Sequence, residues 1–247
     1  RKLVEYLFNQ IVKIVDLFYQ KKITIFFKNN LDDRFDVLLD VGAHKGETIS
    51  NFLKNFKIKN IYSFEASKNT YQTLEYNIDK IKNIYKETNI EIFNFGIGNS
   101  VESKIFYELP DSNSSTFNLI DQKSSYFKRK NRILSFFFKK KFNIKENYVS
   151  QIKLSQFIKN KELIKIDILK IDTEGYELDV LKGLEEKIKI VNFIYFEHHY
   201  DNMIKKNYKF SEIHEFLLYN GFYRVFKIKM PLRKSFDYIY KKKQYKS

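Results

Sequence analysis

A short loop with two glycines is the first segment whose residue types suit chemistry. Residues 40–48 read DVGAHKGET and join an apolar run to a helix predicted at 46–56. Gly42 and Gly46 lack a Cβ, so the backbone can approach a ligand closely. The start of the helix offers free N–H groups to a carboxylate, and Asp40 is placed to help hold a cationic group. The loop predicts a small-molecule site, with a plain tight turn as the alternative.

Two common nucleotide-binding patterns do not fit this loop. The dinucleotide pattern requires glycine where the chain has His44. The P-loop requires Gly-Lys-Ser/Thr, whereas Gly46 is followed by Glu47. The remaining pattern has an acid before its first glycine. It suits a ligand that carries a sulfonium, an amino group and a carboxylate but no phosphates.

A second carboxylate closes the next predicted strand. Glu65 ends the apolar run at 60–65, where a carboxylate can accept hydrogen bonds from both hydroxyls of a ribose. An acid at this point otherwise has to stay solvated or paired. After the third run, 90–95, the small residues around Asn94 and Gly96 would lie beside the base of such a ligand. An ordinary turn after the strand explains these last residues equally well.

A second group of acids follows the fourth and fifth apolar runs. Asp172 and Glu174 stand in LKIDTEGYE, and Glu197 and His198 end FIYFEHH. The carboxyl ends of strands in an open α/β sheet are where ligands bind, so we expect these four residues to converge. If the sulfonium ligand donates a methyl group to a hydroxyl, the hydroxyl must lie in line with that methyl group and a base must remove its proton. A carboxylate or a neutral His can be that base. Helix capping by Thr173 or Asp172 is the structural alternative.

The elements that position these residues alternate along the chain. Strands are predicted at 36–43, 60–65, 90–95, 164–171 and 190–197, helices at 46–56, 68–83, 151–160, 176–188 and 211–220, a short β extension at 103–109, and a final hairpin at 222–229 and 236–242. Ser67 is the expected N-cap of the second helix. Residues 3–19 have helical spacing and predict an amphipathic helix that caps the sheet or pairs with another chain. Alternation of this kind is typical of a parallel α/β sheet.

The motifs, in this order and spacing, resemble the FkbM-type family of class I S-adenosylmethionine-dependent methyltransferases. The resemblance rests on DVGAHKGET, FEA, NFGIG, SSTF, LKIDTEGYELDVLKGL and FIYFEHH, and it covers roughly residues 36–200. One departure is Ala66, because many relatives have Pro after the strand-end acid. This change should affect the stiffness of the loop and not the carboxylate.

The resemblance implies a Rossmann-like class I fold. Such a fold has a mostly parallel seven-stranded sheet, an antiparallel C-terminal strand and helices on both faces. It also implies S-adenosylmethionine as the cofactor. The expected cofactor-binding residues are Asp40, Gly42, Ala43, His44, Gly46, Glu65, Ala66, Asn94 and Gly96, and the expected catalytic residues are Asp172, Glu174, Glu197 and His198. We expect no metal; a site made of Asp172, Glu197 and a His is an alternative that the spacing does not diagnose.

A basic and aromatic insertion lies outside the well-matched motifs. We divide the chain into an N-terminal helical extension at 1–35 and a methyltransferase domain at 36–247, interrupted at about 110–150. Within the insertion, seven Lys and Arg residues at 128–141 flank an apolar group at 133–138. The segment is either a lid that meets an anionic or lipid-linked acceptor and a membrane surface, or a basic surface helix whose aromatic residues pack on the domain.

The composition bounds the partners and the compartment. The net charge is +15. The sequence has no cysteine, which excludes Cys-based zinc sites and thiol nucleophiles. Most of the charge is consistent with a Lys- and Asn-rich composition bias. Members of the family commonly methylate sugar hydroxyls of surface glycans or secondary metabolites, so we expect a glycan or small-molecule acceptor.

Rival functions are an RNA methyltransferase and a domain that binds without catalysis. The Asn/Asp-Pro-Pro-aromatic signature of base amino-methylation is absent, so a nucleic-acid acceptor is disfavoured. No apolar run reaches the ~18 residues of a membrane span, so we expect a cytoplasmic protein. The basic insertion adds the expectation of a peripheral contact at the inner membrane face. The oligomeric state is open.

Overall fold

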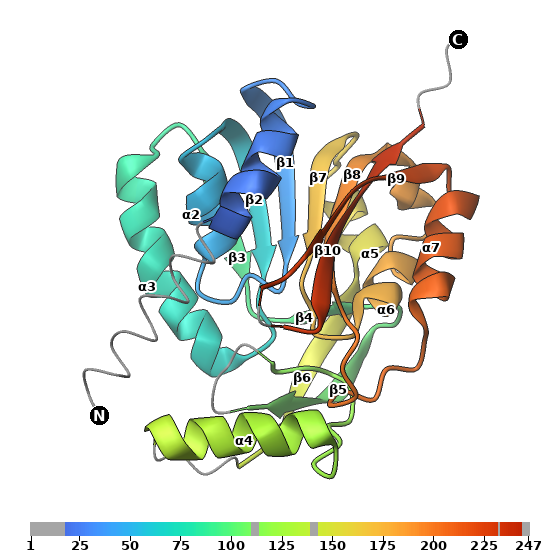
Figure 1. The fold of residues 1–247 in the computed structure, drawn as a ribbon. Coiled ribbons are helices and arrows are strands. Elements are labelled where there is room, and N and C mark those ends of the chain that lie inside the picture. Colours follow the sequence, from blue (N-terminus) through green and yellow to red (C-terminus); the bar gives the residue numbers. More distant parts are fainter. Residues whose placement is uncertain (1–17, 110–113, 139–142, 232, 244–247) are drawn as a thin grey trace.

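The computed structural model describes residues 18–109, 114–138, 143–231 and 233–243. A large twisted sheet is covered by helices on both faces, and a smaller sheet with one long helix lies beyond the carboxyl ends of its first strands (Figure 1). Most of the predicted helix at 3–19 falls outside the described residues. No helix in the described part of the chain is long and apolar enough to cross a membrane.

The described part of the large sheet has seven strands: β1 (Arg34–Val41), β2 (Lys57–Phe64), β3 (Asn89–Phe93), β7 (Ile166–Ile171), β8 (Val191–His199), β9 (Phe222–Lys229) and β10 (Ser235–Lys242). Their order is β3-β2-β1-β7-β8-β10-β9. In this described sheet β10 runs antiparallel to both of its neighbours, β8 and β9, and the other paired strands are parallel. This arrangement confirms the predicted fold class.

Two hydrophobic cores hold helices against opposite faces of the sheet. One face is covered by the helical residues 18–28, α2 (Glu47–Leu53) and α3 (Lys68–Ile84). The other is covered by α5 (Leu154–Asn160), α6 (Glu177–Lys182), the 3-10 helix η1 (Glu185–Ile190) and α7 (Phe210–Tyr219). The described end of the N-terminal segment therefore caps the sheet, with Phe27 packed on Phe52, Phe193 and Tyr195.

Local sequence signals set several helix ends. Ser67 is the N-cap of α3, as predicted, and its hydroxyl accepts a hydrogen bond from the Thr70 N–H at 3.2 Å. The single helix predicted at 176–188 is wrong, because α6 ends at Lys182 and a 3-10 helix follows. The break lies at Gly183, where a Cβ would overlap the carbonyl oxygen of Gly98. This close approach excludes a side chain at the helix end.

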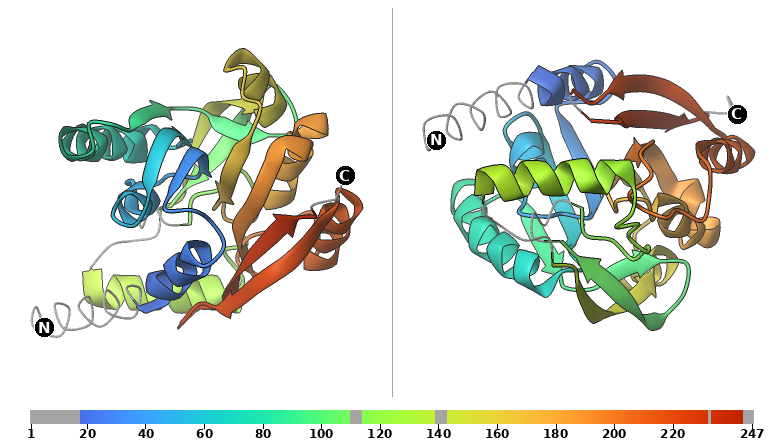
Figure 2. Two further views of the ribbon diagram at one scale, coloured as in Figure 1. Left: turned by 90° about the horizontal axis from the view of Figure 1, so that it is seen from above. Right: turned by 60° about the horizontal axis from the view of Figure 1, so that its bottom comes forward.

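The insertion builds a second sheet together with the residues before it. In the described residues β4 (Gly96–Gly98), β6 (Lys145–Lys153) and β5 (Glu102–Glu108) pair in the order β4-β6-β5. The sequence missed β6 and extended the next helix back to 151, because KENYVSQIK is mostly polar and its first residues are exposed. The helix α4 (Ser125–Phe138) crosses the end of the molecule (Figure 2).

Only part of the insertion's packing lies among the described side chains. Phe127 of α4 is buried in a small cluster with Leu109, Met203 and Ile204. The apolar side chains predicted to pack at 133–138 lie outside the described ones, so the choice between a lid and a packed surface helix stays open.

Candidate active site

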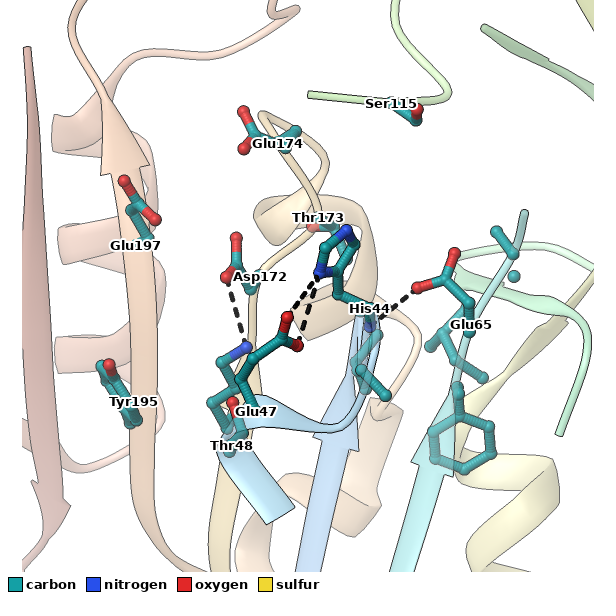
Figure 3. Close-up of a pocket in the computed structure, with 18 of the residues that line it drawn as sticks. His44, Glu47, Thr48, Glu65, Ser115, Asp172, Thr173, Glu174, Tyr195 and Glu197 are labelled. Carbon is teal, nitrogen blue, oxygen red and sulfur yellow. Dashed lines mark hydrogen bonds and ion pairs between the residues drawn. The ribbon is translucent and has the colours of Figure 1, made fainter. Parts of the chain in front are cut away.

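A cavity of about 250 Å³ lies at the carboxyl ends of the central strands. Its lining comes from the ends of β2, β1, β7, β8 and β10, which are neighbours in the sheet. Strand order therefore sets the order of the side chains, from Glu65 on one side, past Asp172, to Glu197 on the other (Figure 3). Asp237 lies beside Glu197 on the next strand, β10. Nine of the thirteen predicted site residues line the cavity, and the four that do not are Asp40, Gly46, Asn94 and His198.

The glycine loop has the backbone conformation that only glycine adopts without strain. Gly42 and Gly46 have φ values of 82° and 91°. A Cβ on Gly42 would overlap the carbonyl oxygen of Asp172, so the loop packs directly on the end of β7. The N–H groups of Gly42 and Ala43 both donate to the Phe64 carbonyl. These contacts fix the loop as one wall of the cavity.

Glu65 is held rigidly at the end of β2. One carboxylate oxygen accepts a hydrogen bond from the His44 N–H and the other from the Ser67 N–H, each at 2.9 Å. Burial raises the pKa of Glu65 to about 7. Each oxygen keeps a second lone pair, so the carboxylate can still accept hydrogen bonds from a ligand in the cavity.

The neighbouring part of the cavity is apolar. Ala66, Phe95 and Gly96 line it, and a Cβ on Gly96 would overlap the ring of Phe117. Asn94, predicted to contact the cofactor, does not line the cavity: it is exposed, and its side chain donates to the Glu65 carbonyl at 2.9 Å. Asn94 therefore fixes the turn that carries Glu65.

Asp40 also lies outside the cavity lining. It is fully buried, and Lys170 Nζ stands 3.6 Å from its carboxylate and 3.2 Å from that of Asp172. Burial raises the pKa of Asp40 to about 6. Burial opposes the charge of Lys170, but Asp172 and Asp40 raise its pKa overall. The prediction missed Lys170, although a Lys inside the buried run IKIDILKI was a signal.

The acids after β7 and β8 do meet. His199 Nε2 lies 3.1 Å from Glu174 and 3.3 Å from Glu197, and its Nδ1 lies 3.4 Å from Asp201. Burial opposes protonation of His199, but Glu174 and Glu197 raise its pKa to about 10. Burial, followed by the charges of Glu197 and Asp172, raises the pKa of Glu174 to about 8 against the opposing effect of His199.

His198 does not join this group, and its predicted position is wrong. Successive side chains of a strand point to opposite faces, so Glu197 and His199 face the cavity while His198 faces α7. Its ring lies 4.8 Å from that of Tyr200 and 5.4 Å from that of Phe210. Burial lowers its pKa to about 3. The sequence alone does not show which of the two adjacent histidines shares a face with Glu197, and the sheet shows that it is His199.

Asp172 and Thr173 do not cap α6. That helix has no side-chain cap, and the loop before it is held from inside by Glu177. The fully buried Glu177 accepts hydrogen bonds from the Gly175 N–H at 2.8 Å and the Thr173 hydroxyl at 3.2 Å, and Tyr208 donates to its other oxygen. Glu177 thus shapes the loop that presents Asp172 and Glu174.

The cavity fits S-adenosylmethionine by the chemistry of its walls. The glycine loop and Glu65 would hold the nucleoside, and Ala66, Phe95 and Phe117 offer an apolar slot for its base. Asp172 and Glu174 lie at the place for a sulfonium and an amino group, and the lining also includes the cationic side chains of Lys170 and Arg233. Among the described residues no three His, Cys, Asp or Glu side chains are arranged to hold a metal ion.

Comparisons with known proteins agree with this geometry. The family model for the methyltransferase FkbM domain matches residues 40–224. No curated protein matches the chain. The methyltransferase FkbM of Methylobacillus flagellatus is similar in structure, with TM-score 0.53 and 14% identity over 84% of this chain and 44% of that one. The chain thus spans less than half the length of that protein.

Two other solved structures share the fold. The magnesium protoporphyrin IX methyltransferase of Synechocystis, with bound S-adenosylmethionine, has TM-score 0.54 and 8% identity over 94% of this chain and 82% of that one. TrmK of M. capricolum, with bound S-adenosylhomocysteine, has TM-score 0.50 and 12% identity over 92% and 69%. The family model covers more than half of the chain, including both acidic segments, so the chain belongs to the FkbM methyltransferase family and is an S-adenosylmethionine-dependent methyltransferase.

Proposed function

We propose that this enzyme is an O-methyltransferase that acts on a sugar hydroxyl of a surface glycan, a glycolipid or a related metabolite. One observation carries the proposal: beyond Asp172 the cavity is lined mainly by hydrogen-bonding acids. Glu174, Glu197 and Asp237 line this end together with Arg233, and Tyr195 adds a hydroxyl. Sugar hydroxyls donate hydrogen bonds to carboxylates, whereas a flipped nucleobase is held by stacking.

Glu174 is the residue best suited to remove the proton from the acceptor. It lines the cavity beside Asp172 on the loop after β7 (Figure 3), and its pKa of about 8 makes it a stronger base than an ordinary carboxylate. Asp172 is less suited, because Lys170 and His199 hold its pKa below the ordinary value although burial alone would raise it. The pair formed with His199 keeps the Glu174 carboxylate in place.

The remaining residues bind and orient. S-adenosylmethionine, when bound, supplies an electrophilic methyl group. The Gly42 loop and Glu65 hold the nucleoside end, and Asp172, kept ionised by Lys170, faces the cationic groups. An acceptor hydroxyl held beside Glu174 would pass its proton to that carboxylate, and the cavity walls would keep its oxygen in line with the methyl group, so that the O–C bond would form as the S–C bond breaks and S-adenosylhomocysteine leaves.

RNA methylation is the competing function, and the lining of the cavity favours it less. The basic residues Lys128, Arg129 and Arg132 are exposed on α4, and they would attract a polyanion. At the chemical end, however, the carboxyl groups of Glu174, Glu197 and Asp237 suit hydroxyl donors better than a phosphate, which only accepts hydrogen bonds. We assign the basic surface of α4 to an anionic carrier of the sugar, such as a lipid-linked acceptor at the inner membrane face in the cytoplasm.

A labelled-methyl assay tests the proposal. Wild-type protein with labelled S-adenosylmethionine is incubated with cell glycans, glycolipids and RNA, and the methylated fraction is digested and identified. We expect label in an O-methyl sugar. Label in RNA and in no sugar contradicts the proposed acceptor, and absence of S-adenosylhomocysteine binding by calorimetry to folded protein contradicts the cofactor assignment.

A further inference from the structure

The cavity extends beyond the residues that the family model matches. Gln20, Met230, Arg233 and Asp237 line it, and all four lie outside residues 40–224. Asp237 belongs to β10, so this wall lies past Glu197 on the side of the sheet farthest from Glu65. The matched domain builds the cofactor end, and the flanks of the chain complete the opposite end.

Two segments far apart in sequence form this wall. The helical residues 18–28 lie beside the β9–β10 hairpin in both views of Figure 2. The Phe26 and Phe226 rings are 5.0 Å apart, and the Tyr19 hydroxyl donates to the Ile228 carbonyl at 3.5 Å. Tyr19 is buried in this contact. The wall is therefore a packed structure that holds Gln20 over the cavity.

The polar groups of the wall are arranged to accept hydrogen bonds. Glu197 and Asp237 are direct cross-strand partners, which places their side chains about 5 Å apart on one face. Tyr195 donates to one oxygen of Asp237 at 2.8 Å and fixes it. The buried Oε1 of Glu197 has no hydrogen-bond partner among the described residues, with His199 as its ion-pair neighbour.

Gln20 and Met230 supply the other two kinds of contact that a sugar ring needs. The Gln20 amide oxygen accepts a hydrogen bond from Asn51 at 3.5 Å, which leaves the amide N–H₂ for a ligand. Met230 is half-buried and offers an apolar surface to the C–H face of a ring. Paired acceptors, the donors of Gln20 and Arg233 and an apolar side chain are together the contacts that a polyhydroxylated ring can use.

We infer that Gln20, Met230, Glu197 and Asp237 form the acceptor subsite and bind a sugar ring through two hydroxyls adjacent to the one that is methylated. The inference rests on the proposed function and deepens it. It assigns the choice of acceptor to the N-terminal helix and the C-terminal hairpin, separately from cofactor binding.

The test uses methyl hexosides and methyl 6-deoxyhexosides, together with their monodeoxy derivatives, as probes. Their binding to protein saturated with S-adenosylhomocysteine is measured by ligand-observed NMR for wild type, Gln20→Ala and Met230→Ala. Gln72→Ala, an exposed position on α3, is the matched control. We expect about three- to tenfold weaker glycoside binding in the two wall variants and unchanged binding in the control.

Measuring cofactor binding distinguishes failure of the acceptor subsite from failure of the proposed function. S-adenosylhomocysteine affinity, measured by calorimetry, should stay within about twofold in all variants, and removal of one neighbouring hydroxyl should weaken glycoside binding to wild type about tenfold. If wild type binds S-adenosylhomocysteine but none of the glycosides, or if both wall variants bind them as well as wild type does, the acceptor subsite is refuted. Methyl transfer to RNA alone would instead refute the proposed function.

Discussion

Replacing Lys170 with methionine removes the ammonium that stands between the fully buried Asp40 and the half-buried Asp172. Its Nζ lies 3.2 Å from Asp172 and 3.6 Å from Asp40, and Lys170 is only 7% exposed. Methionine keeps much of the side-chain volume, so lost packing contributes little. Removing one partner of a buried ion pair costs roughly 3–5 kcal/mol of unfolding free energy. In a chain of this size that lowers Tm by roughly 6–20 °C.

The loss should depend on pH in a defined direction. Burial raises the pKa of Asp40 to about 6 even with Lys170 present, and removal of Lys170 raises the folded-state pKa values of Asp40 and Asp172 further. An acid whose folded pKa exceeds its unfolded pKa binds more protons when folded, so stability falls as pH rises through the folded pKa. The difference from wild type should therefore be small near about pH 5 and largest near about pH 8.

Thermal and urea unfolding at both pH values measures this difference. Lys153→Met is the matched control, because Lys153 pairs with Glu185 at 2.7 Å while the two side chains are 32% and 44% exposed, and such surface pairs contribute about 0–1 kcal/mol. A Lys170→Met loss no larger than that of the control, or a loss that does not grow with pH, would refute the reasoning that these carboxylates depend on the ammonium.

Three further predictions concern the cavity. Glu65→Gln should weaken S-adenosylhomocysteine binding about tenfold or more in calorimetry, because an amide replaces one acceptor oxygen by a donor; unchanged affinity contradicts its role. Glu174→Gln should lower kcat about 10²- to 10⁴-fold and leave cofactor affinity unchanged. The kcat of wild type should rise with pH up to about 8, where the carboxylate becomes ionised. A kcat that falls over this pH range argues for another base. His198→Phe should leave turnover close to wild type while His199→Phe abolishes most of it, since only His199 contacts the acids; equal losses would show that the strand face does not decide their roles.

The order of the helices and strands could be predicted from the sequence, because buried parallel strands are continuous apolar runs with a glycine or an acid at the end. β1 and β7 were visible for this reason, and so were the Gly42 loop and Glu65. The strand β6 was not visible, because an exposed strand of a small sheet carries mostly polar side chains. Its pairing with β5 depends on contacts between segments about 40 residues apart, which local patterns do not contain.

Prediction of the site failed where one residue decides the face of a strand. The motif FEHH offers two histidines, and only pairing of β8 with β10 shows which one shares a face with Glu197. The residues that flank the family domain were missed for another reason. Gln20 and Met230 carry no motif, and they reach the cavity only because the N-terminal helix and the hairpin pack against each other across the sheet.

The net charge of +15 and the acid-lined cavity belong to different parts of the molecule, and this separation bears on the choice of acceptor. The exposed Lys and Arg residues of α4 attract anions over long distances. Inside the cavity His199 lies between Glu174 and Glu197 and offsets their charge, and carboxylate oxygens suit the hydroxyls of a sugar, which donate hydrogen bonds, better than a phosphate, which only accepts them. An acceptor that satisfies both regions is anionic at one end and neutral, with free hydroxyls, at the end that is methylated. A sugar on a phosphorylated carrier has this distribution of charge, whereas RNA carries its charge on every nucleotide up to the reacting one.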